Sequence, residues 1–152
     1  MKSKNIFIII YVLTCILSSC NKDHNPVPQT SLNNVLIYNI EDDPEYSDVR
    51  NLYGSVYYDR NNICDGYNCN GIIIFRAKIE DAHDDFKVFD RTCTHEAGNC
   101  ALNIDSEYSE KLVCPCCGSV FNMIGEYMEK GPAKYPLQQF DCNYSDGNLR
   151  IY

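Results

Sequence analysis

Hydrophobic and polar positions along the chain group into short apolar or alternating runs, a pattern typical of β-strands. These runs occupy residues 35–40, 51–59, 71–79, 86–89, 112–113, 119–123, 137–144 and 148–152. The run 71–79 is almost continuously apolar and predicts a strand buried on both faces. Asp146-Gly147 predicts a hairpin turn between the last two runs. Because helical periodicity never exceeds two turns, we expect one all-β domain over residues 34–152.

The first nineteen residues have a different pattern. Lys2 and Lys4 precede an apolar stretch, residues 6–17, that is shorter than the roughly 20 residues of a membrane-spanning helix and typical of a secretory signal. It ends in Leu17-Ser18-Ser19-Cys20, which resembles the bacterial lipoprotein box. The resemblance implies removal of residues 1–19 and lipidation of Cys20, whose several acyl chains would anchor the protein stably. An ordinary signal peptide followed by a chance cysteine is the alternative.

The polar residues 20–33, with Pro26 and Pro28, predict a flexible tether between the lipidated cysteine and the domain. We expect no specific role for His24 in this segment. These features predict a lipid-anchored protein of the bacterial cell envelope, at the outer membrane, on its periplasmic or its surface face. Disulfides can form in such a compartment.

Composition excludes several functions. The formal charge of −8 argues against nucleic acid binding, which needs a basic surface. Twelve tyrosines and no tryptophan agree with a chain rich in strands. The sequence shows no serine–histidine–aspartate set, phosphate-binding loop or paired catalytic carboxylates, so it carries no hydrolase or kinase signature.

Two short clusters of cysteine and histidine carry the candidate chemistry. The first is Cys93-Thr94-His95, and eighteen residues separate it from the second, Cys114-Pro115-Cys116-Cys117. Thiolates and imidazoles bind iron or zinc. A C-x-H paired with a C-x-x-C supplies four ligands from two loops, as a closed four-coordinate site requires. The candidate metal ligands are therefore Cys93, His95, Cys114 and Cys117.

These clusters resemble the Rieske [2Fe–2S] family. Residues 114–121 are similar to the family's C-P-C-H-G-S-x-F segment, and residues 131–137 to its G-P-A-x-x-P-L loop. The resemblance extends over residues 71–152. It implies a Rieske-like antiparallel β domain with a small cluster-binding subdomain near residues 91–100 and 112–123. It also implies a [2Fe–2S] cluster near the surface, used for one-electron transfer with a redox protein partner.

Cys117 occupies the position of the family's second histidine. Rieske centres with two histidines have potentials of about −150 to +300 mV, and all-cysteine plant-type clusters have potentials of about −400 mV. A thiolate in place of one imidazole adds negative charge and favours the oxidised form, so we expect an intermediate potential. With one titrating imidazole lost, coupling between proton and electron weakens. We therefore do not expect quinol oxidation of the respiratory-complex kind.

Three interpretations of the four-ligand site stay open. The first is an intact [2Fe–2S] cluster in a membrane-anchored electron carrier or redox subunit. The second is a cluster-free fold, with its cysteines oxidised to disulfides, that has a structural or interaction role. The third is a mononuclear zinc site of the Cys3His type. The chain has no room for the extra catalytic domain of an oxygenase, so we expect a carrier rather than a stand-alone enzyme.

The remaining cysteines suggest cross-links. The resemblance implies a disulfide between Cys100 and Cys116 that joins the two ligand loops. Cys64 and Cys69 flank a turn-rich stretch and form either a local bridge or two free thiols. Cys142 has no evident partner, and a buried core cysteine is one explanation. An exchange of roles, with Cys116 as ligand and the following cysteine in the bridge, is also open.

Overall fold

The computed structural model describes residues 24–58, 60, 63–95 and 100–152. Within them, strands form three antiparallel sheets, ordered β1-β11-β10, β2-β3-β4-β9 and β5-β6-β7-β8. The elements are β1 (Val35–Ile37), η1 (Pro44–Arg50), β2 (Ser55–Tyr58), η2 (Tyr67–Cys69), β3 (Ile72–Arg76), β4 (Phe86–Asp90), β5 (Asn103–Ile104), β6 (Lys111–Val113), β7 (Val120–Asn122), β8 (Tyr127–Lys130), β9 (Gln139–Phe140), β10 (Cys142–Ser145) and β11 (Asn148–Ile151).

The predicted all-β class is confirmed. The apolar run 71–79 forms β3, whose five residues are all buried between β2 and β4. The predicted hairpin is also confirmed, since β10 and β11 pair directly across Asp146 and Gly147. Both turn residues have positive φ, 51° and 77°, as a two-residue type I′ turn requires.

Four elements were not predicted. They are the 3-10 helices η1 and η2 and the short strands β5 and β8. Asp43 caps η1 by accepting a hydrogen bond from the Glu45 N–H, and Pro44 supplies a suitable first residue. β8 shows only one half-buried residue among exposed ones, so its sequence carries little apolar alternation.

The first two sheets form the part that we call the base. Their facing side chains make one apolar core, to which β1, β3, β4, β9, β10 and β11 contribute. Along β3 the side chains alternate between two cores: Ile72 and Ile74 enter the base core, whereas Ile73 and Phe75 point to the opposite face. This period of two explains why the strand is apolar throughout.

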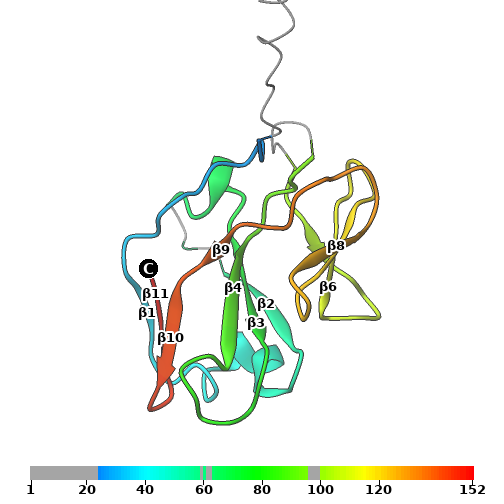
Figure 1. Cartoon of the computed structure of the whole chain (residues 1–152). Helices are drawn as coiled ribbons and strands as arrows, with labels where there is room; N and C mark the ends of the chain where they lie inside the picture. The colour runs from blue at the N-terminus through cyan, green and yellow to red at the C-terminus, as the bar shows by residue number, and fades with distance from the viewer. Residues whose placement is uncertain (1–23, 59, 61–62, 96–99) are drawn as a thin grey trace, which may run out of the picture.

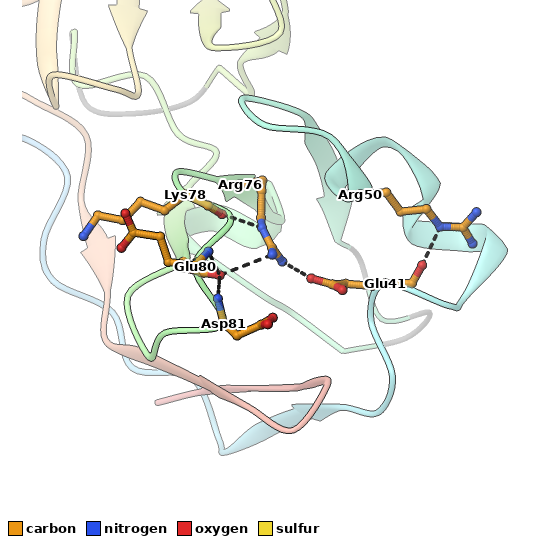
Figure 2. Close-up of polar contacts among 7 residues, drawn as sticks. Glu41, Arg50, Arg76, Lys78, Glu80 and Asp81 are labelled. Atoms are coloured by element: carbon orange, nitrogen blue, oxygen red, sulfur yellow. Dashed lines mark hydrogen bonds and ion pairs between the residues drawn. The ribbon is translucent and has the colours of Figure 1, made fainter.

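A buried arginine lies at one end of the base core. Arg76 forms ion pairs with Glu41 and with the fully buried Asp85 (Figure 2). Asp85 also accepts hydrogen bonds of 3.0 Å from the N–H groups of Glu80 and Asp81. The guanidinium and the carboxylate therefore replace their lost hydration with several charge-assisted bonds, as buried ions require.

Residues 24–33 pack against the domain over the part of the predicted tether that the structure describes. Val27 is 1% exposed, and Leu32 belongs to the base core. The carbonyl of Val27 accepts a 2.9 Å hydrogen bond from Gln138 Nε2. The sequence shows these residues as polar and proline-containing, and it gives no sign that Val27 has a distant partner. The folded unit therefore extends before residue 34, while the predicted signal and Cys20 lie outside the described residues.

No helix in the described part of the chain is long and apolar enough to cross a bilayer.

Candidate metal centre

The third sheet, β5 to β8, forms a separate subdomain beside the base (Figure 1). Its core contains Leu102, Leu112, Phe121 and Met123, together with side chains from the second face of β3 and β4. Cys93 and Cys114 are buried members of the same core. Apolar packing therefore fixes two of the predicted ligands, Cys93 and Cys114, independently of a metal.

The first ligand loop follows β4. Cys93 N–H donates to the Cys100 carbonyl at 2.9 Å, and Leu102 N–H donates to the Arg91 carbonyl at 2.7 Å. These bonds make a narrow hairpin base that holds Cys93. His95 lies two residues further along, just before residues 96–99, which the structure does not describe.

The second ligand loop connects β6 and β7. Cys114 N–H donates to the Ser119 carbonyl at 2.8 Å, and Gly118 N–H donates to the Cys114 carbonyl at 2.9 Å. Gly118 has a φ of 71°, which a glycine adopts without steric cost. The resulting tight turn brings Cys117 back toward the Cys114 side chain.

Three of the four predicted ligands converge. The sulfur atoms of Cys93, Cys114 and Cys117 all lie within 4.8 Å of one another, and those of Cys93 and Cys117 are 3.6 Å apart. None of the three is in a disulfide. His95 is not a member of this group; it lines an adjoining depression together with Thr94. The described residues therefore bring three thiols together, with the imidazole on the same loop as the first of them.

The environments of these thiols differ. Burial raises the pKa of Cys93 well above its usual value. Burial also acts to raise the pKa of Cys117, but hydrogen bonds with Ser119 and with the two neighbouring thiols outweigh it and lower that pKa. The Cys117 sulfur lies 3.1 Å from Ser119 Oγ. Metal binding to such a site requires thiolates, so it would release the proton of Cys93.

A disulfide between Cys100 and Cys116 joins the two ligand loops, as the family resemblance implies, with the two Cα atoms 6.3 Å apart. Cys116 is the bridging residue and Cys117 is free, so the exchange of roles left open by the sequence does not occur. The bridge holds the loops together independently of a metal.

The other cysteines lie outside the thiol cluster. Cys64 and Cys69 form the local disulfide that the turn-rich stretch between them suggested. Cys142 is a free thiol packed against the base core, and its sulfur donates to the Phe86 carbonyl at 3.3 Å. Burial raises the pKa of Cys142 to about 11.

The proline-containing loop after β8 closes over both ligand loops. Ala133 N–H donates to Ser119 Oγ at 3.1 Å, and Thr94 Oγ1 donates to the Tyr135 carbonyl at 2.6 Å. Gly131 has a φ of 106°, and a Cβ at this position would lie 2.4 Å from the Ser119 Cα. Only glycine therefore permits the close approach of the two loops.

Asp90, at the end of β4, is a supporting residue that sequence reasoning missed. Its buried carboxylate accepts hydrogen bonds from Tyr67 N–H at 2.7 Å, Thr92 N–H at 2.9 Å and Thr30 Oγ1 at 3.3 Å. It thus connects the N-terminal segment and the Cys64–Cys69 loop to the residue before Cys93. The only available signal was an acidic residue at the end of an apolar strand, directly before the ligand loop.

Comparison with known proteins agrees with this geometry. The profile of the Rieske [2Fe-2S] domain matches residues 57–141, more than half of the chain, so the chain belongs to the Rieske [2Fe–2S] domain family. Among curated proteins, none matches significantly.

Several solved structures are similar to this chain, and two of them illustrate the likeness. One is the cyanobacterial plasma membrane Rieske protein PetC3 from Synechocystis PCC 6803, with 22% identity, a TM-score of 0.48, and coverage of 64% of this chain and 85% of that one. The other is a complex of reduced oxygenase and oxidized ferredoxin in carbazole 1,9a-dioxygenase, with 18% identity, a TM-score of 0.41, and coverage of 66% and 81%.

Proposed function

We propose that this protein is a one-electron carrier that holds a [2Fe–2S] cluster with Cys93, His95, Cys114 and Cys117. The observation that carries the proposal is the convergence of three free thiols at the junction of two loops. The two disulfides among the described residues exclude these three thiols, although the sulfurs approach within 4.8 Å. A thiol cluster that is kept unpaired beside a disulfide is suited to a soft metal.

The donor set fits the family's cluster with one change. In Rieske centres two histidines replace two cysteines on one iron, so Cys93 and Cys114 would hold one iron, and His95 and Cys117 the other. When bound, the cluster supplies a site that gains or loses one electron. The protein's own part is to fix the ligands through the disulfide and to hold the Ser119 hydroxyl 3.1 Å from the Cys117 sulfur, where it would donate a hydrogen bond once that sulfur is a thiolate ligand. Such bonds stabilise the reduced form.

A mononuclear zinc site is the second candidate, and the sulfur geometry favours it. Zinc–sulfur bonds of about 2.3 Å in a tetrahedron place two sulfurs roughly 3.8 Å apart. The sulfurs of Cys93 and Cys117 are 3.6 Å apart, which suits ligands of a single ion. In a [2Fe–2S] cluster these two sulfurs would bind different irons, so cluster binding would have to move them apart.

We further propose that the mature chain begins at Cys20 and is anchored in the bacterial cell envelope by lipid on that residue. The support is the Leu17-Ser18-Ser19-Cys20 segment after a short apolar stretch. The outer membrane is the expected location, and a redox protein in or at the same membrane is the expected partner. Both disulfides agree with an oxidising compartment.

The test is to purify the domain without oxygen, starting at residue 21, and to measure its iron, zinc and paramagnetic resonance spectrum before and after dithionite. The proposal predicts about two irons per chain and a signal that appears on reduction. Stoichiometric zinc without iron would select the mononuclear site. A metal-free protein with Cys93, Cys114 and Cys117 oxidised would contradict both, and would leave a structural or interaction role.

A further inference from the structure

The first described residues of the chain lie at the candidate metal centre. His24 and Pro26 line a depression of about 310 Å³ with residues of the first ligand loop and of the proline-containing loop. The other lining residues are Thr94, His95, Pro132, Lys134 and Tyr135. We call this depression and its lining residues the tip. The N-terminal segment and the candidate ligand loop therefore reach the surface at the same place.

The N-terminal segment is fixed there by specific contacts; we call residues 24–30 the strap. The Val27 side chain is buried, its N–H donates to Asn25 Oδ1 at 3.0 Å, and its carbonyl accepts from Gln138 Nε2 at 2.9 Å. Thr30 is bonded to Asp90, which also supports the first ligand loop. The strap is thus held at both the proline-containing loop and the ligand loop.

We infer that the tip is an interaction surface for a lipid bilayer, so that the protein presents its metal centre to the membrane that anchors it. The inference rests on lipid attachment at Cys20, which is part of the proposed function. Only three residues lie between Cys20 and His24, so the two Cα atoms are at most about 14 Å apart when the chain is fully extended. A strap that ends at the tip then keeps the tip within that distance of the bilayer surface.

The distribution of charge supports this orientation. None of the tip residues is acidic, and Lys134 is exposed there, although the chain has 21 acidic residues and a net charge of −8. The opposite end of the molecule carries η1 and the acidic residues just before it (Figure 1). The acidic residues there are Glu41, Asp42 and Asp43 before η1, and Glu45 and Asp48 within it. An envelope membrane with anionic headgroups repels the acidic end and accepts the tip.

The orientation restricts the electron partner. With the ligand loops directed at the bilayer, electrons pass to a partner in or on the same membrane, and a partner in bulk solvent meets the acidic end. Most of the tether predicted over residues 20–33 is therefore packed against the domain, because Val27 is already buried.

The chain contains no tryptophan, so one introduced tryptophan reports its own surroundings. The test uses the full lipidated protein in vesicles of phosphatidylcholine and phosphatidylglycerol that contain a headgroup-nitroxide lipid. Tyr135→Trp places the reporter at the tip. Tyr38→Trp is the matched control, because Tyr38 is 68% exposed and follows β1, away from the tip. Quenching several-fold stronger for Tyr135→Trp than for Tyr38→Trp is expected; equal quenching, or the reverse order, overturns the inference.

Two further variants keep the test decisive. A long Gly-Ser spacer inserted after residue 23 leaves the fold untouched and should abolish most of the Tyr135→Trp quenching, because the anchor no longer limits the distance. Quenching that is unchanged by the spacer overturns the role of the strap. The wild-type chain should sediment with the vesicles, and the Cys20→Ser variant should not. A wild-type chain that also fails to sediment overturns the inference, because lipid attachment at Cys20 is its premise. Metal content measured on the same preparation reports separately on the metal centre.

Discussion

The base and the cluster-binding subdomain share β3 and β4 but differ in what holds them together. The base encloses a core of aliphatic and aromatic side chains from six strands. The subdomain has a smaller core, two of whose buried members are the thiols of Cys93 and Cys114, and a disulfide joins its loops. Burial of apolar surface therefore supplies most of the stability of the base, together with the buried Arg76–Asp85 ion pair, whereas the subdomain adds a disulfide between its ligand loops. The base thus provides the stable framework, and the subdomain carries the candidate metal ligands.

The largest effect should come from Cys93→Ser, which leaves the base intact but removes a buried ligand. We expect loss of the bound metal and of visible absorbance, because oxygen replaces a soft thiolate donor. Metal analysis of the purified variant checks this, with Cys142→Ser as the control that keeps its metal. Full metal content in Cys93→Ser would mean that the site lies elsewhere.

In the base, Arg76→Met should destabilise the fold by about 3–5 kcal/mol, since Asp85 would keep a buried charge without its cation. Urea unfolding measures the loss. Lys78→Gln, which breaks the exposed ion pair with Asp84, should leave the unfolding midpoint unchanged. If both variants behaved alike, the buried network would not be what stabilises this end of the base.

Removing the Cys100–Cys116 disulfide with a double serine variant should cost about 3 kcal/mol in the chain-entropy model, and should speed metal loss because the ligand loops separate. The Cys64–Cys69 disulfide closes a shorter loop, so the corresponding double serine variant should lose only about 2 kcal/mol of stability. Thermal unfolding and the rate of metal transfer to a chelator provide the comparison. Faster metal loss in the second variant than in the first would reverse the assigned roles.

Cys117→His restores the second imidazole of the family. The reduction potential should rise by on the order of 100 mV or more, because a neutral ligand replaces an anionic one. A redox titration followed by paramagnetic resonance measures the shift. An unchanged or lower potential would show that Cys117 does not bind the cluster.

The smallest effect concerns alkaline pH. The folded pKa of Cys142 is about 11, above its ordinary value of about 9, because burial disfavours the thiolate. Its stabilising contribution is complete below pH 9 and is lost as pH rises through 11, by about 3 kcal/mol at most. In Cys142→Ala the decline in unfolding free energy between pH 9 and 11 should be shallower than in the wild type. Parallel declines would place the alkaline sensitivity elsewhere, for example at Tyr46.

The sequence predicted those features whose cause is local. The apolar run that forms β3, the Asp146-Gly147 turn and the two short cysteine motifs that begin at Cys93 and Cys114 each depend on neighbouring residues. The Cys100–Cys116 bridge came from the resemblance to the Rieske family. These features were sufficient to predict the fold class and the thiols that converge.

The features that were missed depend on distant partners. The carbonyl of Val27 accepts a hydrogen bond from Gln138, more than a hundred residues away in the chain. Asp90 becomes a supporting residue only when Tyr67 and Thr30 approach it. A single sequence carries no direct sign of such contacts, so the packed strap and the support behind the ligand loop came only from the structure.

Amide hydrogen exchange, compared between metal-loaded and metal-free protein, tests most directly whether the two regions are held by different means. The account predicts that metal removal speeds exchange at Leu112 and Phe121 in the subdomain sheet and leaves Ile72 and Ile74 in the base unchanged. Equal changes in both regions, or no change in the subdomain, would contradict it.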